Sequence, residues 1–336
     1  MVGTAALRIV FFGTPAFAVP TLDALLASRH AVVAVITQPD RPRGRGQKLT
    51  DAPVKARALL AGLPVLQPER LKDPTFLETV QMLRADLGVV AAYGKILTDA
   101  VLASPRLGMI NVHASLLPRY RGAAPVHRAI MAGERETGVT IMRVVKALDA
   151  GPMLAKVGRL IEPEETSVEV ERDLAHLGAR LLIASVEQIA AGRIHETPQD
   201  DGAATYAPRL TKSDGAIDWS WPAERIHNLI RGLHPWPHAY TFLHGTRLIL
   251  LRSSPSPAGA EPSDRAGPAH RSAATNTAPG TIVGTDGDRL VVATGAGRIR
   301  LTLVQPEGKR PMTPRDFLAG HPVASGDRFD AAPAKE

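Results

Sequence analysis

The chain has 336 residues, a length that favours two domains because single hydrophobic cores stop growing at about 250–300 residues. It contains no cysteine, which excludes disulfides, thiolate catalysis and cysteine-based metal sites, and this fits a cytoplasmic protein. The net charge of +7 and the pI of about 9.9 fit either a polyanionic partner such as nucleic acid or a solubilising surface.

The first half of the chain alternates short apolar runs with stretches of helical spacing. In chain order we predict strands at residues 7–12, 31–39, 87–93, 108–114 and 138–145, and helices at 21–28, 51–63, 76–83 and 167–191. This alternation predicts an α/β domain with a mostly parallel sheet and helices on both faces. Only one glycine follows the first strand, so a dinucleotide fingerprint is absent.

The character of the sequence changes after about residue 192. We predict a first domain over residues 1–192, a polar linker over 193–212, a small β-barrel over 213–321, and a weakly structured tail over 322–336. Residues 253–280 are rich in proline, alanine, serine and glycine without periodicity, which indicates a flexible insertion in the barrel.

The sequence gives no sign of membrane targeting. The apolar stretch near the N-terminus is short, is interrupted by Arg8 and runs into a turn, unlike a signal peptide. No segment approaches the roughly 18 uninterrupted apolar residues of a membrane span. We therefore expect a protein without membrane contact, and nothing in the sequence requires more than a monomer.

Three polar residues stand out between positions 111 and 149. Asn111 and His113 lie two apart at the end of a predicted strand, so both side chains point to the same face, and Asp149 follows later. An amide, an imidazole and a carboxylate can stabilise an oxyanion and move a proton. No serine or cysteine nucleophile accompanies them, which favours direct transfer. A structural role for the histidine is the alternative.

Two further segments would lie near the same edge of the sheet. The loop Ser115, Leu116, Leu117 and Pro118 offers backbone polar groups beside two leucines, a mixture that suits a flat heteroaromatic ring. In open α/β sheets ligands bind beyond the carboxyl ends of the strands, where Tyr93 is also expected.

A basic loop occupies residues 37–50. It carries Arg41, Arg43, Arg45 and Lys48 against the single acid Asp40. Such a loop could hold phosphates beside an active site, although its composition also fits a solvated loop without a partner. The histidines of the second half match no ordinary zinc spacing, so no metal is expected.

Taken together, the segments NVHASLLPRYRGAAPVHRAI, ETGVTIM, LDAGPML and TQPDRPRGRGQKL resemble the methionyl-tRNA formyltransferases. The resemblance covers nearly the whole chain except the insertion and the tail. It implies a Rossmann-like formyltransferase catalytic domain joined to an OB-like, tRNA-binding barrel. It also implies 10-formyltetrahydrofolate as formyl donor and initiator methionyl-tRNA as acceptor, giving formylmethionyl-tRNA for translation initiation. One departure is Ala114, where the family also has glycine.

The resemblance also implies roles for individual residues. Asn111, His113 and Asp149 match the catalytic trio, and Ser115–Pro118 matches the folate-binding signature. The loop with Arg45 matches the segment that inserts toward the acceptor stem. Whether Asp149 takes the amine proton directly or through water stays open.

Three other functions fit parts of the sequence. The nearest is another formyltransferase, acting on glycinamide ribonucleotide or an aminosugar, and the basic loop and barrel argue against it. A non-catalytic RNA-binding module is disfavoured by the intact polar trio. A nicotinamide-dependent oxidoreductase is disfavoured by the missing glycine fingerprint.

Overall fold

The computed structural model describes residues 5–40, 42–43, 48–256 and 277–330. The chain divides into two compact units. Unit 1 comprises residues 1–125, 136–160 and 170–208, and unit 2 comprises residues 126–135, 161–169 and 209–336. The domain boundaries expected from the sequence stay predictions.

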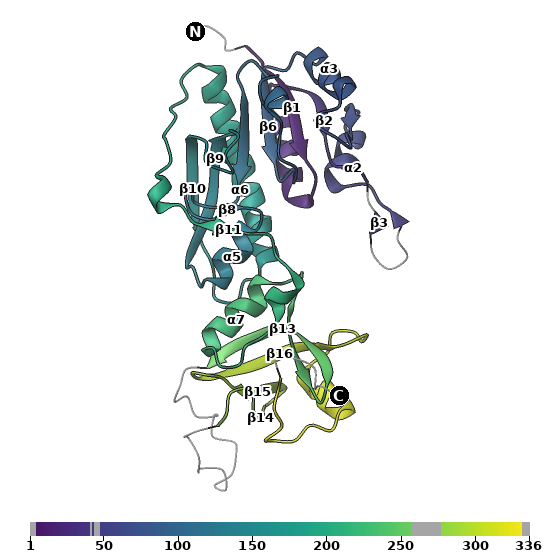
Figure 1. The fold of residues 1–336 in the computed structure, drawn as a ribbon, viewed down its shortest axis with the longest axis vertical. Coiled ribbons are helices and arrows are strands. Elements are labelled where there is room, and N and C mark those ends of the chain that lie inside the picture. The colour runs from purple at the N-terminus through teal and green to yellow at the C-terminus, as the bar shows by residue number, and fades with distance from the viewer. Residues whose placement is uncertain (1–4, 41, 44–47, 257–276, 331–336) are drawn as a thin grey trace. The chain divides into compact units, whose positions relative to one another are not determined.

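Unit 1 is built on a seven-stranded sheet (Figure 1). Its parallel strands are β1 (Arg8–Gly13), β2 (Ala31–Ile36), β5 (Val65–Leu66), β6 (Leu87–Ala91) and β7 (Met109–His113). The antiparallel strands β9 (Glu136–Arg143) and β10 (Met153–Leu160) complete the order β10-β9-β7-β6-β1-β2-β5. The predicted mostly parallel sheet is therefore confirmed, whereas its two edge strands, β5 and β10, were not anticipated.

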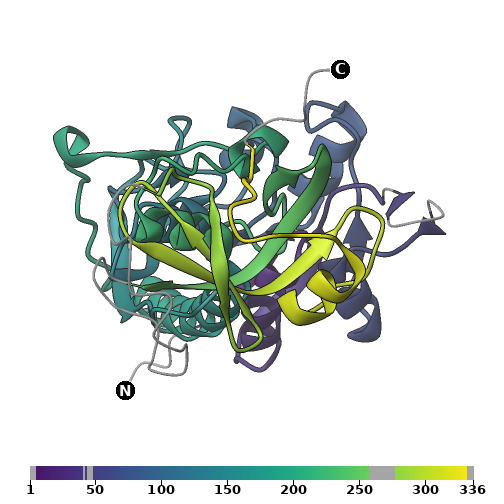
Figure 2. The same ribbon diagram turned by 90° about the horizontal axis from the view of Figure 1, so that it is seen from below.

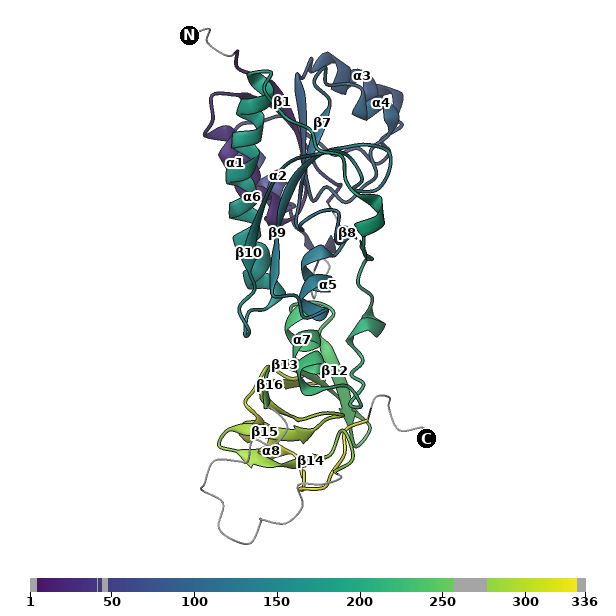
Figure 3. The same ribbon diagram turned by 90° about the vertical axis from the view of Figure 1, so that its left-hand side faces the viewer.

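Helices cover both faces of this sheet, because residues along its central strands are apolar in both directions. Figure 3 shows α1 (Val19–Leu26) and α6 (Ser167–Ala190) on one side of the strands, and α3 (Pro74–Met82) and α4 (Asp99–Leu102) on the other. The alternation of β1 explains this: Val10 and Phe12 belong to the core cluster that contains Phe76 of α3 and Val101 of α4. The remaining helices of this unit are α2 (Pro53–Leu60) and two 3-10 turns, Ala16–Ala18 and Asp201–Ala203.

The order in which successive strands are added to the sheet changes direction at β1. From β1 the chain proceeds outward to β2 and β5, and then returns to β6 on the other side of β1. Such a reversal opens a crevice at the carboxyl ends of the strands, which is where ligands bind in open α/β sheets. The ends of β1, β6 and β7 lie along this edge.

Two short ladders accompany the main sheet. One pairs β3 (Pro42–Arg43) with β4 (Lys48–Leu49), and the other pairs β8 (Arg121–Gly122) with β11 (Tyr206–Ala207) in parallel. The second ladder fixes the chain after the Ser115–Pro118 loop against a segment 85 residues later.

Unit 2 contains an antiparallel five-stranded sheet in the order β12-β13-β16-β15-β14, as predicted for a β-type second domain (Figure 2). The strands are Ala239–Leu243, Thr246–Ser256, Ile282–Asp286, Arg289–Ala293 and Arg298–Pro306 for β12 to β16. Three helices, α5 (Pro125–Met131), α7 (Ala223–Gly232) and α8 (Pro314–Gly320), and a 3-10 turn at Lys212–Gly215 accompany them.

The C-terminal segment closes this sheet, and the expectation of a weakly structured tail is wrong up to residue 330. Asp330 bridges to Phe242 of β12, and Arg328 bridges to Thr281 just before β14, so the segment joins both edges of the sheet. Phe329 is buried and stacks on Trp219 with ring centroids 5.2 Å apart. The tail is ordered there because it supplies both backbone pairing and an apolar side chain.

The first four residues of the expected insertion belong to a strand, and the insertion itself stays a prediction. Ser253–Ser256 continue β13 and pair with β16, so they are not flexible. Residues 257–276 lie outside the described part of the chain. Within the described part, no helix is both long and apolar enough to span a bilayer.

Candidate functional site

The first candidate group lies at the end of β7. Strand alternation puts Asn111 and His113 on the face of Met109, which belongs to the core cluster under α3 and α4. Asn111 is half-buried and lies opposite Val90 and Met142 in the ladder. None of the described residues forms a hydrogen bond with its side-chain amide. The amide is therefore available to a ligand.

His113 is 5% exposed, and its ring is oriented by the protein backbone. Its Nε2 donates to the carbonyl oxygen of Tyr120 at 3.0 Å, and its Nδ1 lies 3.7 Å from Oδ2 of Asp149. The second distance is too long for a hydrogen bond but leaves the two groups poised for one after a small movement. The structure thus brings together two groups that are 36 residues apart in sequence.

Asp149 is held by a backbone donor and by its own backbone conformation. Its Oδ2 accepts from the N–H of Gly122 at 2.9 Å, and its φ is +47°, in the left-handed region that asparagine and aspartate tolerate best. Gly151 follows in a place where a Cβ would overlap the carbonyl oxygen of Arg143. The turn after Asp149 therefore requires glycine.

The Ser115–Pro118 loop is fixed by a buried hydroxyl from β9. Thr140 Oγ1 donates to the carbonyl oxygen of Ser115 at 2.7 Å and accepts from the N–H of Leu117 at 3.1 Å. Ser115 and Leu117 are buried, whereas Leu116 and Pro118 are half-buried. The loop therefore presents alternate residues outward, next to His113.

Tyr93 follows β6, but its ring belongs to the core. The side chain is 2% exposed, packs edge to face on Phe12, and its hydroxyl has no partner among the described residues. Burial raises the pKa of this phenol to about 12. Its carbonyl oxygen accepts from Gln38 and Thr14, which lie at the ends of the neighbouring strands. Contact between Tyr93 and a cofactor stays a prediction.

The basic loop is described only in part. Arg41 and Arg45 lie outside the described residues, whereas Arg43 is in β3 and Lys48 is in β4.

The base of this hairpin is closed by a lysine. Lys55 of α2 forms an ion pair with Asp40, before the hairpin, and another with Asp51, after it, at 2.8 Å. The hydrogen bond with Asp40 is the main reason that the pKa of Lys55 is raised and that of Asp40 is lowered. Lys55 therefore joins the two ends of the hairpin.

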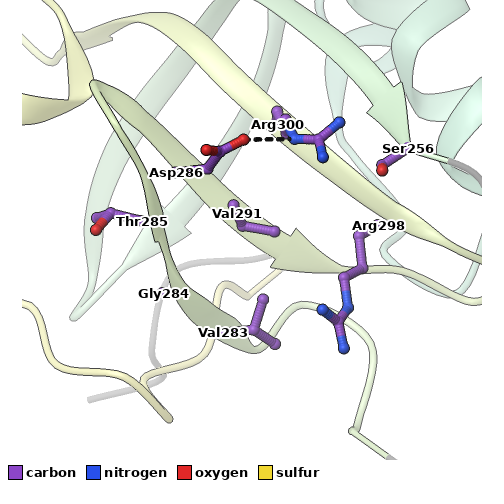
Figure 4. Close-up of a pocket in the computed structure, with 8 residues that line it drawn as sticks. All are labelled: Ser256, Val283, Gly284, Thr285, Asp286, Val291, Arg298 and Arg300. Carbon is purple, nitrogen blue, oxygen red and sulfur yellow. Dashed lines mark ion pairs between the residues drawn. The ribbon is translucent and has the colours of Figure 1, made fainter. Parts of the chain in front are cut away.

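A pocket lies against the sheet of unit 2, and no sequence pattern predicted it. Figure 4 shows side chains of β14, β15 and β16 around it, with Arg298 and Arg300 on one strand. Arg300 is paired with Asp286 at 3.0 Å, whereas Arg298 forms no ion pair with any described residue. The pocket wall thus carries one uncompensated positive charge.

The described residues contain no group of three or more histidine, aspartate or glutamate side chains that could hold a metal ion.

Sequence reasoning missed the residues that hold the site together. Tyr120, Gly122 and Thr140 contact the site through backbone groups or a hydroxyl, and Gln199 hydrogen-bonds to the carbonyl oxygen of Asp149. Neither periodicity nor motif chemistry distinguishes such residues from ordinary loop and strand positions. Only the position of the Arg121–Gly122 pair, directly after the candidate loop, was available as a signal.

The fold and the site define a transferase of one chemical class. Residues 7–186 match the family described as formyl transferase, and residues 209–322 match the formyl transferase C-terminal domain. Two crystal structures share the fold. The N-formyltransferase of Helicobacter canadensis, in complex with folinic acid and dTDP-3-aminofucose, has a TM-score of 0.64 at 17% identity, covering 89% of this chain and 99% of that one. HypX of Aquifex aeolicus, in complex with tetrahydrofolic acid, has a TM-score of 0.62 at 15% identity, covering 97% and 51%.

Sequence relatives narrow the class further. The methionyl-tRNA formyltransferase of Moorella thermoacetica is 48% identical over 96% of this chain and 98% of its own length. That of Heliobacterium modesticaldum is 46% identical over 96% of this chain and its entire length. The chain belongs to the methionyl-tRNA formyltransferase family and is an enzyme.

Proposed function

We propose that the protein transfers the formyl group of 10-formyltetrahydrofolate to the α-amino group of methionine on initiator methionyl-tRNA. The product is the formylmethionyl-tRNA used to begin translation. The observation that carries this proposal is the end-to-end likeness to methionyl-tRNA formyltransferases, which includes the second unit. We place the reaction in the cytoplasm, with the chain acting as a monomer.

The chemistry requires no covalent enzyme intermediate. The neutral amine attacks the formyl carbon, forming a carbon–nitrogen bond and placing negative charge on the formyl oxygen. The tetrahedral intermediate then collapses as the bond to N10 of the folate breaks. The amine loses one proton and N10 gains one, so tetrahydrofolate leaves neutral at that nitrogen.

The residues at the end of β7 are suited to these two tasks. The amide of Asn111 has no hydrogen-bond partner among the described residues and can donate to the developing oxyanion. His113 already donates from Nε2 to Tyr120, so it can donate a second hydrogen bond, from Nδ1, only when both ring nitrogens carry a proton. Asp149, 3.7 Å from that Nδ1, would orient it and take the amine proton, directly or through water.

The folate would lie against the Ser115–Pro118 loop. Its alternate exposed residues and adjacent backbone groups offer both apolar contact and hydrogen bonds, which a pteridine ring requires. Tyr93 would support this site from the neighbouring strand. No metal takes part in the proposed reaction.

The tRNA would be held by charge. Contacts with the acceptor end would come from Arg41, Arg43, Arg45 and Lys48, and Arg298 of β16 in unit 2 would contact more distant backbone. Contacts with phosphate weaken as salt rises, and the loss of one contact reduces the salt slope by about one. Arg45→Ala should therefore impair tRNA use much more than folate binding, and an equal loss of both would count against this division.

The decisive experiment compares acceptors. Formyl transfer is measured with charged initiator tRNA, charged elongator tRNA and free methionine, at saturating 10-formyltetrahydrofolate. Transfer confined to the initiator supports the proposal. Transfer to none of them, with folate still bound, would favour the rival formyltransferase acting on a small-molecule amine.

A further inference from the structure

Gln199 makes an unusually complete set of hydrogen bonds for a residue in a segment expected to be a linker. Its Nε2 donates to the carbonyl oxygens of Asp149 and Gly151, each at 2.8 Å. Its Oε1 accepts from Nε and Nη2 of Arg121, at 3.0 and 2.8 Å. All four positions of the amide are used, so its orientation is fixed.

The two sides of this amide hold two different parts of the candidate site. On one side lies the backbone of Asp149. On the other side lies Arg121, between Tyr120, whose carbonyl oxygen orients His113, and Gly122, whose N–H binds the Asp149 carboxylate. One side chain therefore joins the segment that carries the carboxylate to the segment that orients the imidazole.

Both ends of this connection need an external partner. Arg121 is 4% exposed, and a buried guanidinium is costly unless its donors are paired. Asp149 has a left-handed backbone, which the surrounding structure must hold in place. Arg121 forms an ion pair with Asp201 at 2.7 Å, which balances its charge, and donates as well to Oε1 of Gln199. The amide of Gln199 at the same time holds the backbone of Asp149.

We propose that Gln199 is a positioning residue for this reaction: it sets the separation of Asp149 from His113. The inference rests on the proposed function, in which Asp149 orients His113 and takes the amine proton. At 3.7 Å the two side chains are just outside hydrogen-bond range, so a shift of about 1 Å decides whether Asp149 contacts the imidazole. Misplacement of that size costs about 100-fold in rate.

The Gln199→Glu substitution tests the donor role of the amide separately from its acceptor role. A carboxylate still accepts from Arg121, but it cannot donate to the two carbonyl oxygens and repels them. We expect kcat for formyl transfer to fall about 10–100-fold, as for other residues that orient a reacting group, with KM for both substrates within about twofold. Gln188→Glu, the same change at an exposed position of α6, is the matched control and should leave kcat unchanged.

A double-mutant cycle with Asp149→Asn distinguishes positioning from general stability. If Gln199 acts through Asp149, adding Gln199→Glu to Asp149→Asn should lower kcat by less than about threefold. A full 10–100-fold further loss, or wild-type kcat in the single variant, would overturn the proposal. If the Gln199→Glu variant does not fold, the same measurements are made on Gln199→Met. Wild-type turnover of Asp149→Asn would instead overturn the proposed catalytic role of Asp149, and the positioning role with it.

Discussion

Replacing Asn111 by alanine tests the proposed oxyanion site most directly. The side-chain amide has no hydrogen-bond partner among the described residues, so its removal leaves no protein group unsatisfied. The backbone of residue 111 stays paired within β7, between β6 and β9. We therefore expect a change of less than about 1 kcal/mol in the free energy of unfolding, the range of substitutions that disturb no packed or paired group.

The effect on catalysis should be far larger. Loss of one oxyanion donor costs roughly 100- to 1000-fold in kcat, or about 3–4 kcal/mol of transition-state stabilisation. Because the donor acts on charge that develops only in the transition state, KM for 10-formyltetrahydrofolate and for methionyl-tRNA should change little. Asn111→Asp, of nearly equal shape, should lose at least as much because its carboxylate repels the oxyanion.

The assay is steady-state formyl transfer to charged initiator tRNA, with kcat and both KM values measured, beside thermal unfolding of each variant. A kcat for Asn111→Ala above about one third of the wild-type value, with an unchanged unfolding temperature, would refute the oxyanion role. A loss confined to KM would indicate that the amide binds substrate without assisting the chemical step.

Three further predictions concern the surroundings of the site and the barrel. Thr140→Val leaves the carbonyl of Ser115 and the N–H of Leu117 without their partner, so chemical denaturation should show a loss of about 1–3 kcal/mol, and KM for the folate should rise. Lys55→Met removes both ion pairs at the base of the basic hairpin and should raise KM for tRNA but not for folate in initial-rate assays; equal effects on both would contradict the role given to the hairpin. Burial lowers the pKa of His227 below the value of about 6.5 expected in the unfolded chain, so the unfolded chain binds more protons. The contribution of His227 to stability is therefore complete above pH 6.5 and is lost as pH falls. The denaturant midpoints at pH 7.5 and 5.5 should differ less for His227→Gln than for the wild-type protein.

The burial of His227 has a clear structural cause. Its Nε2 donates to the carbonyl oxygen of Pro163 at 2.9 Å, and its Nδ1 lies 3.1 Å from Oγ of Ser253 in β13. Both contacts are satisfied by the neutral ring, so protonation would replace an acceptor by a second donor. Ser253 was expected to open a flexible insertion but instead pairs within the sheet and partners this ring.

The sequence by itself was sufficient to predict the strands that are buried along their whole length. Strands such as β1 and β6 are buried on both faces and read as continuous apolar runs, which is why they were found nearly to the residue. The spacing of Asn111 and His113 also sufficed to place both on one face of β7, because strand alternation is a local property. β10 alternates between half-buried and exposed positions without a strong apolar run, and it was missed.

The tertiary structure decided what depends on contacts between distant segments. Asp149 meets Gly122 across 27 residues and Gln199 across 50, and these contacts are single hydrogen bonds that leave no pattern in the sequence. Phe329 is buried only because the tail bridges both edges of the sheet in unit 2. The sequence therefore determined which chemical groups are present, whereas the tertiary structure decided how they are held, because each holding contact depends on where a remote segment is brought by the fold.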